Sequence, residues 1–208
     1  EAVRKGVTDR IRFGVSYCPY AKSGDADMDV WERDVLTMKK LNFNAIRCFV
    51  AWDRIEREEG RCDFSKLDYL FELADKHDMD VILNVGGVFA CYGGIYPPRW
   101  LVRDKRCQHV VEDPQSAGQP FGPYRRICMD DPVFQAKAEE FTRTVIRRYG
   151  KHPRLFGWNV WNEAFSRPMC YCPLTLAKFR AWLKAEYNGD LNRLNELWGT
   201  EFPVLYRD

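Results

Sequence analysis

Apolar and polar residues follow two periods along this chain, that of a β-strand and that of an α-helix. Short apolar runs rich in β-branched and aromatic residues predict strands, and the amphipathic stretches between them predict helices. The predicted strands are residues 11–17, 43–50, 80–86 and 155–163. The predicted helices are residues 29–41, 67–77, 98–103, 131–149, 173–187 and 190–198.

This alternation requires parallel strands joined by helical crossovers, so the predicted class is α/β. No G-x-G-x-x-G fingerprint follows the first strand and no P-loop occurs, which argues against nucleotide-binding doubly wound folds. Four βα units make about half of a (β/α)8 TIM barrel, which typically takes about 250 residues. The chain is short for that fold, and the family resemblance described below implies that residues 1–208 are its first four βα units, the N-terminal half of a catalytic TIM barrel. The segment at about 87–131 is too long for a structural connector and indicates a functional loop.

The fourth predicted strand has two unlike faces when it is read at period two. One face is apolar and suited to packing under helices, and the other becomes polar toward its end. The apolar face comprises Phe156, Trp158 and Val160, and the other face comprises Gly157, Asn159, Trp161 and Glu163. In a barrel the second face points inward and places Glu163 at the carboxyl rim, where TIM-barrel enzymes hold their catalytic groups.

The second predicted strand divides in the same way. Ile46 and Cys48 share one face, whereas Arg47 and Phe49 share the other, so Arg47 is expected to point into the barrel. An inward Arg and an inward Glu cost several kcal/mol of desolvation unless they are paired or functional. The pattern alone leaves two interpretations open, an internal ion pair and a catalytic site.

The overall composition excludes some classes of partner. Thirty-two Lys and Arg stand against 30 Asp and Glu, so the formal net charge is +2 and provides no field that attracts nucleic acid or a membrane surface. No run of 18 apolar residues predicts a membrane span. The first residues lack the apolar region of a signal peptide, which slightly favours a cytoplasmic location over a secreted form whose signal has been removed. Aromatic residues make up 14%, which suits an ordinary core as well as a cleft that stacks sugar rings.

The eight cysteines are scattered and lack the density of a small disulfide scaffold. Cys18 and Cys48 lie in apolar strand-like runs, so we expect them to be reduced core thiols. Cys170 and Cys172, separated by one residue, have the one spacing that is typical of metal ligands.

Four segments resemble the retaining β-glycosidases of the TIM-barrel clan that carry the acid/base on strand 4 and the nucleophile on strand 7. They are RCFVAWDRIEREEGRCDFSKLD (47–68), PPRWLV (97–102), HPRLFGWNVWNEAF (152–165) and CYCPLTLAKFRAWLKAEYNGDLNRLNELWGTEF (170–202). The chain is most similar to the β-galactosidases of glycoside hydrolase family 42, and the resemblance covers nearly the whole chain in the right order.

This resemblance implies hydrolysis of β-glycosidic bonds with retention, and therefore a β-linked saccharide substrate. β-Mannosidases and β-glucosidases of the same clan share the Asn-Glu rim and remain alternatives. The stretch GGVFACYGGIYPPRW departs from the threonine-rich segment usual in the family, which leaves galactose specificity open. Its paired glycines permit close approach of the backbone to a ligand.

The resemblance also assigns roles to individual residues. Glu163 matches the general acid/base, which protonates the leaving oxygen and then deprotonates the water that resolves the glycosyl-enzyme. Asn162 matches the residue that binds the 2-hydroxyl of the sugar, and Arg47 matches the Arg that keeps the nucleophile ionised. Trp161 and Phe165 would line the rim and raise the pKa of Glu163 by desolvation.

Within FGPYRRIC the family usually has an Arg that binds the sugar in the −1 subsite. A gapless match puts Tyr124 at that position and Arg125 one place on, so Arg125 is the candidate. The alternative is that Arg125 and Arg126 form a solvated pair in a loop.

Cys128, Cys170 and Cys172 match three of the four thiolates of the family's structural zinc cluster, and Thr175 stands at the fourth position. Structural zinc normally takes four nitrogen or sulfur ligands. The long loop offers substitutes for the fourth ligand, which are Cys91, Cys107 and His109. The alternative is an eroded cluster of free thiols. The resemblance requires no other cofactor.

A retaining mechanism needs two carboxylates about 5 Å apart, and the family's nucleophile is expected downstream of residue 208. The chain contains other carboxylates after the second strand and in the long loop, none of them at a strand end comparable to that of Glu163. They are Asp53, Glu56, Glu58, Glu59, Glu112 and Asp113. We expect Glu56, Glu58 and Glu59 to form a solvated turn.

Three hypotheses account for a half-barrel. The chain is an N-terminal portion of a complete glycosidase, a natural half-barrel that assembles with a second chain or with itself, or a non-catalytic carbohydrate-binding or inactive domain. An open half-barrel exposes a sheet edge and an apolar interior face, which argues for a partner in the first two cases. We expect the isolated 208-residue chain to be inactive.

Overall fold

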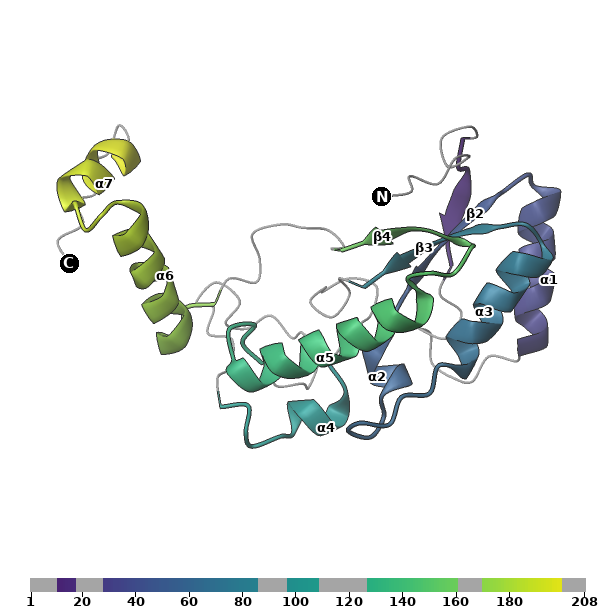
Figure 1. Cartoon of the computed structure of the whole chain (residues 1–208), viewed down its shortest axis with the longest axis horizontal. Coiled ribbons are helices and arrows are strands. Elements are labelled where there is room, and N and C mark those ends of the chain that lie inside the picture. Colours follow the sequence, from purple (N-terminus) through teal and green to yellow (C-terminus); the bar gives the residue numbers. More distant parts are fainter. Residues whose placement is uncertain (1–10, 18–27, 86–96, 109–126, 161–169, 200–208) are drawn as a thin grey trace, which may run out of the picture. The chain divides into compact units, whose positions relative to one another are not determined.

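The computed structural model describes residues 11–17, 28–85, 97–108, 127–160 and 170–199 (Figure 1). The chain divides into two compact units. The first comprises Glu1–Arg106 and Val133–Phe165, and the second comprises Cys107–Pro132 and Ser166–Asp208. Among the described residues, no helix is both long and apolar enough to cross a lipid bilayer.

The first unit contains a four-stranded parallel sheet in the order β1-β2-β3-β4. The strands are β1 (Gly14–Ser16), β2 (Ala45–Phe49), β3 (Asp80–Asn84) and β4 (Leu155–Asn159). Each strand lies within a predicted strand and is shorter than it. Because consecutive strands are neighbours in the sheet, each crossover joins adjacent strands, as in a series of βα units.

Helices fill the crossovers. The first unit has α1 (Met28–Lys40), α2 (Trp52–Ile55), α3 (Ser65–Lys76), α4 (Arg99–Val102) and α5 (Pro132–Tyr149), and the second has α6 (Pro173–Glu186) and α7 (Leu191–Trp198). Figure 1 shows α1, α3 and α5 along one side of the sheet. The single turn α2, directly after β2, escaped prediction because four residues are too few for a helical period to be recognised.

The register of the strands separates two faces of the sheet. Ile46 and Cys48 of β2 and Leu83 of β3 are completely buried, as expected for a face covered by helices. Arg47 belongs to the opposite row, beside Ile82 in the register, and it is half-buried. The pattern of alternating faces in the second strand therefore corresponds to the observed sheet.

The fourth strand contains a register shift that the sequence pattern does not reveal. Val81 is opposite Leu155, but the next residue of β3, Ile82, is opposite Gly157. Phe156 is therefore an extra residue without a partner in β3, as in a β-bulge. The predicted alternation along β4 is interrupted at this point.

The consequence of the bulge is visible in the surroundings of Phe156. The guanidinium of Arg12 lies 4.3 Å from the centre of the Phe156 ring, and the same Arg12 donates a 2.9 Å hydrogen bond to Asp80. Phe156 remains 38% exposed and Val160 72% exposed. The prediction that these two side chains pack under helices is thus wrong.

Aromatic rings join the helices of the first unit. Trp52 is fully buried and stacks on Phe141 of α5, with 5.2 Å between the ring centres. Phe71 of α3 stacks on Tyr149 at the end of α5, with 4.8 Å between the ring centres. Asp68 of α3 accepts a 2.7 Å hydrogen bond from the Tyr149 hydroxyl, which fastens the same two helices.

The helices of the second unit bury much less. In α6, all of whose residues are described, no side chain is buried, and in α7 Leu194 is the buried residue. Asp190 caps α7 by accepting a 3.0 Å hydrogen bond from the backbone N–H of Arg193. The large apolar side chains that remain exposed are Phe179, Trp182, Leu191, Leu197 and Trp198.

Candidate functional site

The predicted catalytic rim lies at the carboxyl ends of the four parallel strands. Arg47 of β2 lies beside Ser16 of β1 in the register and donates a 3.1 Å hydrogen bond to its hydroxyl. Its guanidinium carbon is also 4.8 Å from the centre of the Phe49 ring. Arg47 is therefore held by its neighbours on the inward row, with its charge near the edge where the strands end.

Four predicted site residues lie outside the described residues. They are Trp161, Asn162 and Glu163 after β4, and Arg125 in the long loop. β4 ends at Asn159, four residues before Glu163, so the described part of the chain leads up to the predicted acid/base without including it. The roles assigned to these residues stay predictions.

Asn84 is a residue of this rim that the sequence reasoning missed. It ends β3, and in the register it lies between Phe49 of β2 and Asn159 of β4. Its side chain is completely buried, and neither its Nδ2 nor its Oδ1 meets a hydrogen-bond partner among the described residues. A period-two reading of DVILN would have placed Asn84 on the inward row of the third strand.

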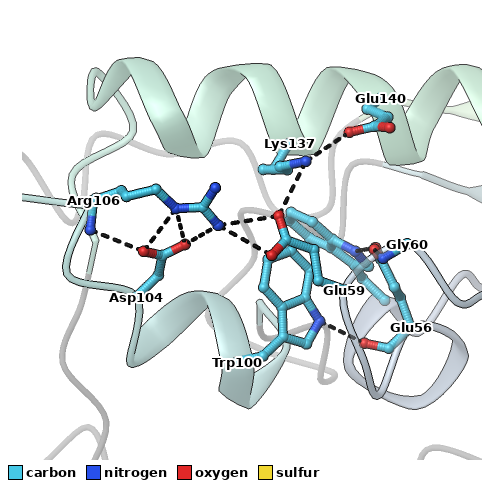
Figure 2. Close-up of polar contacts among 9 residues, drawn as sticks. Glu56, Glu59, Gly60, Trp100, Asp104, Arg106, Lys137 and Glu140 are labelled. Atoms are coloured by element: carbon cyan, nitrogen blue, oxygen red, sulfur yellow. Dashed lines mark hydrogen bonds and ion pairs between the residues drawn. The ribbon is translucent and has the colours of Figure 1, made fainter.

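The turn after β2 is built around the carboxylate of Glu56, as Figure 2 shows. This carboxylate accepts hydrogen bonds from the Trp52 indole N–H at 2.6 Å and from the backbone N–H of Gly60 at 2.7 Å. The Glu56 carbonyl accepts a third from the Trp100 indole N–H at 2.9 Å. Glu56 is only 7% exposed, so the expectation that it lies in a solvated turn is wrong. Hydrogen bonds from three donors thus satisfy its buried carboxylate and carbonyl oxygens.

Glu59 belongs to a second part of the same network (Figure 2). It binds Arg106 through two contacts of 3.0 and 3.1 Å, and Lys137 of α5 at 3.2 Å. Arg106 is also bound to Asp104, and Lys137 to Glu140. Hydrogen bonds from Lys137 and Arg106 hold the pKa of Glu59 below its ordinary value. These contacts fasten the turn to α5 and to the segment after α4, which is a structural role.

The other described carboxylates after β2 also do not occupy the position expected of a nucleophile, which is the inward row of a strand. Glu58 is exposed and pairs with Arg61 at 2.7 Å within the turn. Asp53 lies in α2, with its carboxylate 3.6 Å from Arg54, and burial raises its pKa. Neither residue lies on the inward row of a strand, and Glu112 and Asp113 are outside the described residues.

The three cysteines matched to a metal cluster lie together in the second unit. The sulfur atoms of Cys128, Cys170 and Cys172 are all within 4.8 Å of one another, and those of Cys128 and Cys172 are 3.6 Å apart. Two thiolates bound to one tetrahedral zinc at about 2.3 Å lie about 3.8 Å apart, so these spacings fit zinc. Cys107, also described and buried, does not belong to this group.

Thr175 occupies the fourth position of the cluster. Its hydroxyl lies 3.1 Å from the sulfur of Cys128 and 3.5 Å from that of Cys172, and it donates a 2.7 Å hydrogen bond to Asp130. Lys178 in turn contacts the Asp130 carboxylate at 3.2 Å. The residue that departs from the zinc pattern thus still adjoins two of the thiols.

The pKa values of two of these thiols are shifted in opposite directions. Burial raises the pKa of Cys128 to about 12, although its hydrogen bonds with Thr175 and with the Asp130 N–H oppose this. Burial also acts against ionisation of Cys172, but hydrogen bonds with the Thr175 side chain and backbone and with the neighbouring thiols outweigh it and lower its pKa. Cys172 directly precedes α6, and anions are favoured at the start of a helix.

Comparison of sequences identifies similar proteins of much greater length. Residues 20–206 match the family model described as Glyco_hydro_42: Beta-galactosidase. The β-galactosidase Bga of Halorubrum lacusprofundi is 33% identical over 195 residues, which are 92% of this chain and 26% of that protein. A β-galactosidase of Thermus thermophilus is 30% identical over 175 residues, which are 83% of this chain and 26% of that protein. The chain spans about a quarter of the length of the curated relatives it matches.

Comparison of structures gives the same result. A polyextremophilic β-galactosidase from the Antarctic haloarchaeon Halorubrum lacusprofundi superposes with a TM-score of 0.72 at 30% identity, covering 94% of this chain and 28% of that one. The catalytic domain of a β-amylase from Paenibacillus polymyxa superposes with a TM-score of 0.59 over 92% of this chain and 51% of that one, and at 15% identity this likeness concerns the fold alone. Together with the parallel sheet, these findings confirm the predicted fold, the N-terminal part of a TIM barrel.

Proposed function

The chain belongs to glycoside hydrolase family 42, and we propose that the protein hydrolyses β-galactosides with retention of configuration. The observation that carries this proposal is the family match over residues 20–206, because it includes the Asn162-Glu163 pair in the sequence context of the fourth strand. The names of the similar proteins support β-galactosides as the substrate class. β-Mannosides and β-glucosides are the alternatives within the clan.

In the proposed mechanism Glu163 acts twice. It first protonates the glycosidic oxygen as the leaving group departs, and it then removes a proton from the water that hydrolyses the glycosyl-enzyme. Asn162 would bind the 2-hydroxyl, where a hydrogen bond strengthens toward the transition state. Arg47 would favour the ionised form of the nucleophile, and its inward position beside Ser16 supports this role.

We propose that the nucleophile is a carboxylate outside the 208 residues. Two observations support this. The similar proteins are more than three times as long as this chain, and the described carboxylates after β2 are bound in the turn or lie away from the inward row. The 208-residue chain would then hydrolyse substrate only together with the remainder of a barrel, either in one polypeptide or from a second chain.

We propose in addition that Cys128, Cys170 and Cys172 hold a structural zinc ion. The sulfur spacings support three ligands, and α6, which begins beside them, has no buried side chain to stabilise it otherwise. Thr175 leaves the fourth position to another ligand, because a threonine hydroxyl is not an ordinary zinc ligand. Zinc at this place would stabilise the fold and take no part in the reaction.

The activity is tested with aryl β-galactosides, β-mannosides and β-glucosides, and with lactose as an unactivated substrate. Glu163→Ala should lower kcat/KM for lactose by about 10²–10⁴-fold and spare part of the first step on activated aryl substrates. Added azide should restore turnover by replacing the activated water. Glu58→Ala, which removes an exposed carboxylate, is the matched control.

The assay should compare the 208-residue chain with a longer polypeptide that contains it. Glu163-dependent turnover by the 208 residues alone would refute the proposal that the nucleophile lies outside them. Wild-type rates of Glu163→Ala on lactose would refute the acid/base assignment. Binding of galactosides without turnover in either form would favour a carbohydrate-binding domain.

A further inference from the structure

Asn84 combines two features that are seldom found together. It is the last residue of β3, at the carboxyl edge where barrel enzymes bind their substrates, and its side chain is 0% exposed. Both polar atoms of its amide are buried, and neither has a hydrogen-bond partner among the described residues.

An unpaired buried amide is costly. Leaving a buried donor or acceptor unsatisfied destabilises the folded state, and an apolar side chain of similar size would avoid that cost. The outward residues of the same strand, Val81 and Leu83, are apolar and fully buried. A polar residue at the end of β3 is therefore unfavourable for stability in the ligand-free chain, which is typical of a position that serves a ligand.

The neighbours of Asn84 leave its amide available. In the register Phe49, which offers no polar side-chain atom, stands on one side of Asn84, and Asn159 stands on the other without a hydrogen bond to the Asn84 amide. The backbone groups around it are already engaged, since the Asn84 carbonyl accepts from Val50 at 3.0 Å and Val85 donates to Asn159 at 3.0 Å. These backbone groups therefore have their hydrogen bonds, and the polar atoms without a partner among the described residues are Nδ2 and Oδ1 of the Asn84 side chain.

We propose that Asn84 binds the sugar in the active site, with Nδ2 donating to one hydroxyl and Oδ1 accepting from an adjacent one. A neutral donor beside a neutral acceptor matches a pair of hydroxyls, each of which can donate and accept. Because neither amide atom has a partner among the described residues, a bound sugar would satisfy both at once. This inference rests on the proposed function and names a specificity residue for it.

Stability provides the first test, and it can be made on the 208-residue chain itself. Asn84→Leu replaces the amide by an apolar side chain of similar size, so the urea midpoint should stay the same or rise. Ile82→Val, on the same row of β3, is the control for a small change of volume. A clear fall in the midpoint of Asn84→Leu would show that the amide has a structural partner, which would overturn the inference.

Activity provides the second test, in the form of the protein that turns over aryl β-galactosides. Asn84→Ala should lower kcat/KM by about tenfold to a hundredfold on the parent substrate, since two hydrogen bonds are lost. On each of the two deoxy-galactosides that lack one contacted hydroxyl, Asn84→Ala should cause a smaller loss than on the parent substrate, because one of its two hydrogen bonds is already absent. An equal loss on the parent and on all of the 2-, 3-, 4- and 6-deoxy substrates would refute a direct contact.

The two proposals fail in different ways. If wild type and Glu163→Ala are equally inactive on every glycoside, the proposed function fails, whatever Asn84→Leu does to stability. If wild type is active and Asn84→Ala matches it on all substrates, the role of Asn84 fails and the proposed function stands.

Discussion

Two tryptophans show how differently the two compact units are held together. Trp52 of the first unit is fully buried, stacks on Phe141 and donates a 2.6 Å hydrogen bond to the buried carboxylate of Glu56. Trp182 of the second unit is 51% exposed and stacks on Phe179, which is itself 44% exposed. The same residue type is thus the centre of a core in one unit and a surface residue in the other.

The difference indicates two sources of stability. Burial of large apolar side chains between helices stabilises the first unit, at about 25 cal/mol for each Å² removed from water. In the second unit α6 buries no side chain, and its N-terminal part is instead held by contacts to Cys128 and Asp130, made by Cys172, Thr175 and Lys178. The second unit should therefore depend on its sulfur cluster, and the first unit should not.

The largest effect is expected from Trp52→Ala. The substitution leaves a cavity beside Phe141 and removes a donor from the buried Glu56 carboxylate, so the free energy of unfolding of the first unit should fall by about 3–5 kcal/mol. Urea unfolding followed by circular dichroism measures the change. A loss below about 1 kcal/mol would contradict the view that this ring is central to the core.

The next effect concerns metal binding by the second unit. Cys172→Ser should weaken zinc binding at least about a hundredfold, which corresponds to about 2.7 kcal/mol, because one of three thiolates is lost. Thr175→Cys should strengthen it by completing four thiolates. Cobalt(II) absorption counts the thiolates and competition with a chelator gives the affinity, while Cys48→Ser, a buried thiol of the sheet, is the control. Equal cobalt spectra for wild type and Cys172→Ser would refute the site.

A third effect concerns the hydrogen bonds by which Asp68 of α3 joins Arg148 and Tyr149 of α5, here called the clamp between these helices. Asp68 accepts hydrogen bonds from Arg148 at 2.8 Å and from Tyr149 at 2.7 Å. Burial alone would raise its pKa, but these hydrogen bonds outweigh burial and lower it. Asp68→Asn should therefore cost about 1–2 kcal/mol at pH 7.

The pH dependence of this cost has a definite sign. Because the folded state lowers the pKa of Asp68, the stabilisation is present above the unfolded value of about 3.9 and is lost as the pH falls through the folded value. The difference in unfolding free energy between wild type and Asp68→Asn should thus shrink as the pH is lowered below about 4. Urea titrations at several pH values measure it, and a difference that grows in acid would contradict the clamp.

The sequence predicted the parts of this molecule that follow from local patterns. Alternation of strands and helices was sufficient for the parallel order, and period two placed Arg47 on the row opposite Cys48. Motif matching brought Cys128, Cys170 and Cys172 together before their distances were known. These features depend on residue type and spacing, both of which the sequence contains.

Other features depend on how segments meet in space. The register shift that frees Phe156 arises from pairing with β3, which a single strand does not disclose. Glu56 is buried because Trp100, 44 residues later, donates to its carbonyl and Gly60 folds back on its carboxylate. Asn84 is distinguished by the partners that it lacks among the described residues, and only a three-dimensional arrangement shows such a lack.

The smallest effect is expected from Trp182→Ser, and it completes the contrast with Trp52. Half of the Trp182 side chain is already exposed, so its removal should change the free energy of unfolding by less than about 0.5 kcal/mol. Because the change lowers the exposed apolar area, it should reduce association, which light scattering at rising concentration measures. A loss of stability close to that of Trp52→Ala would mean that the second unit has an apolar core after all.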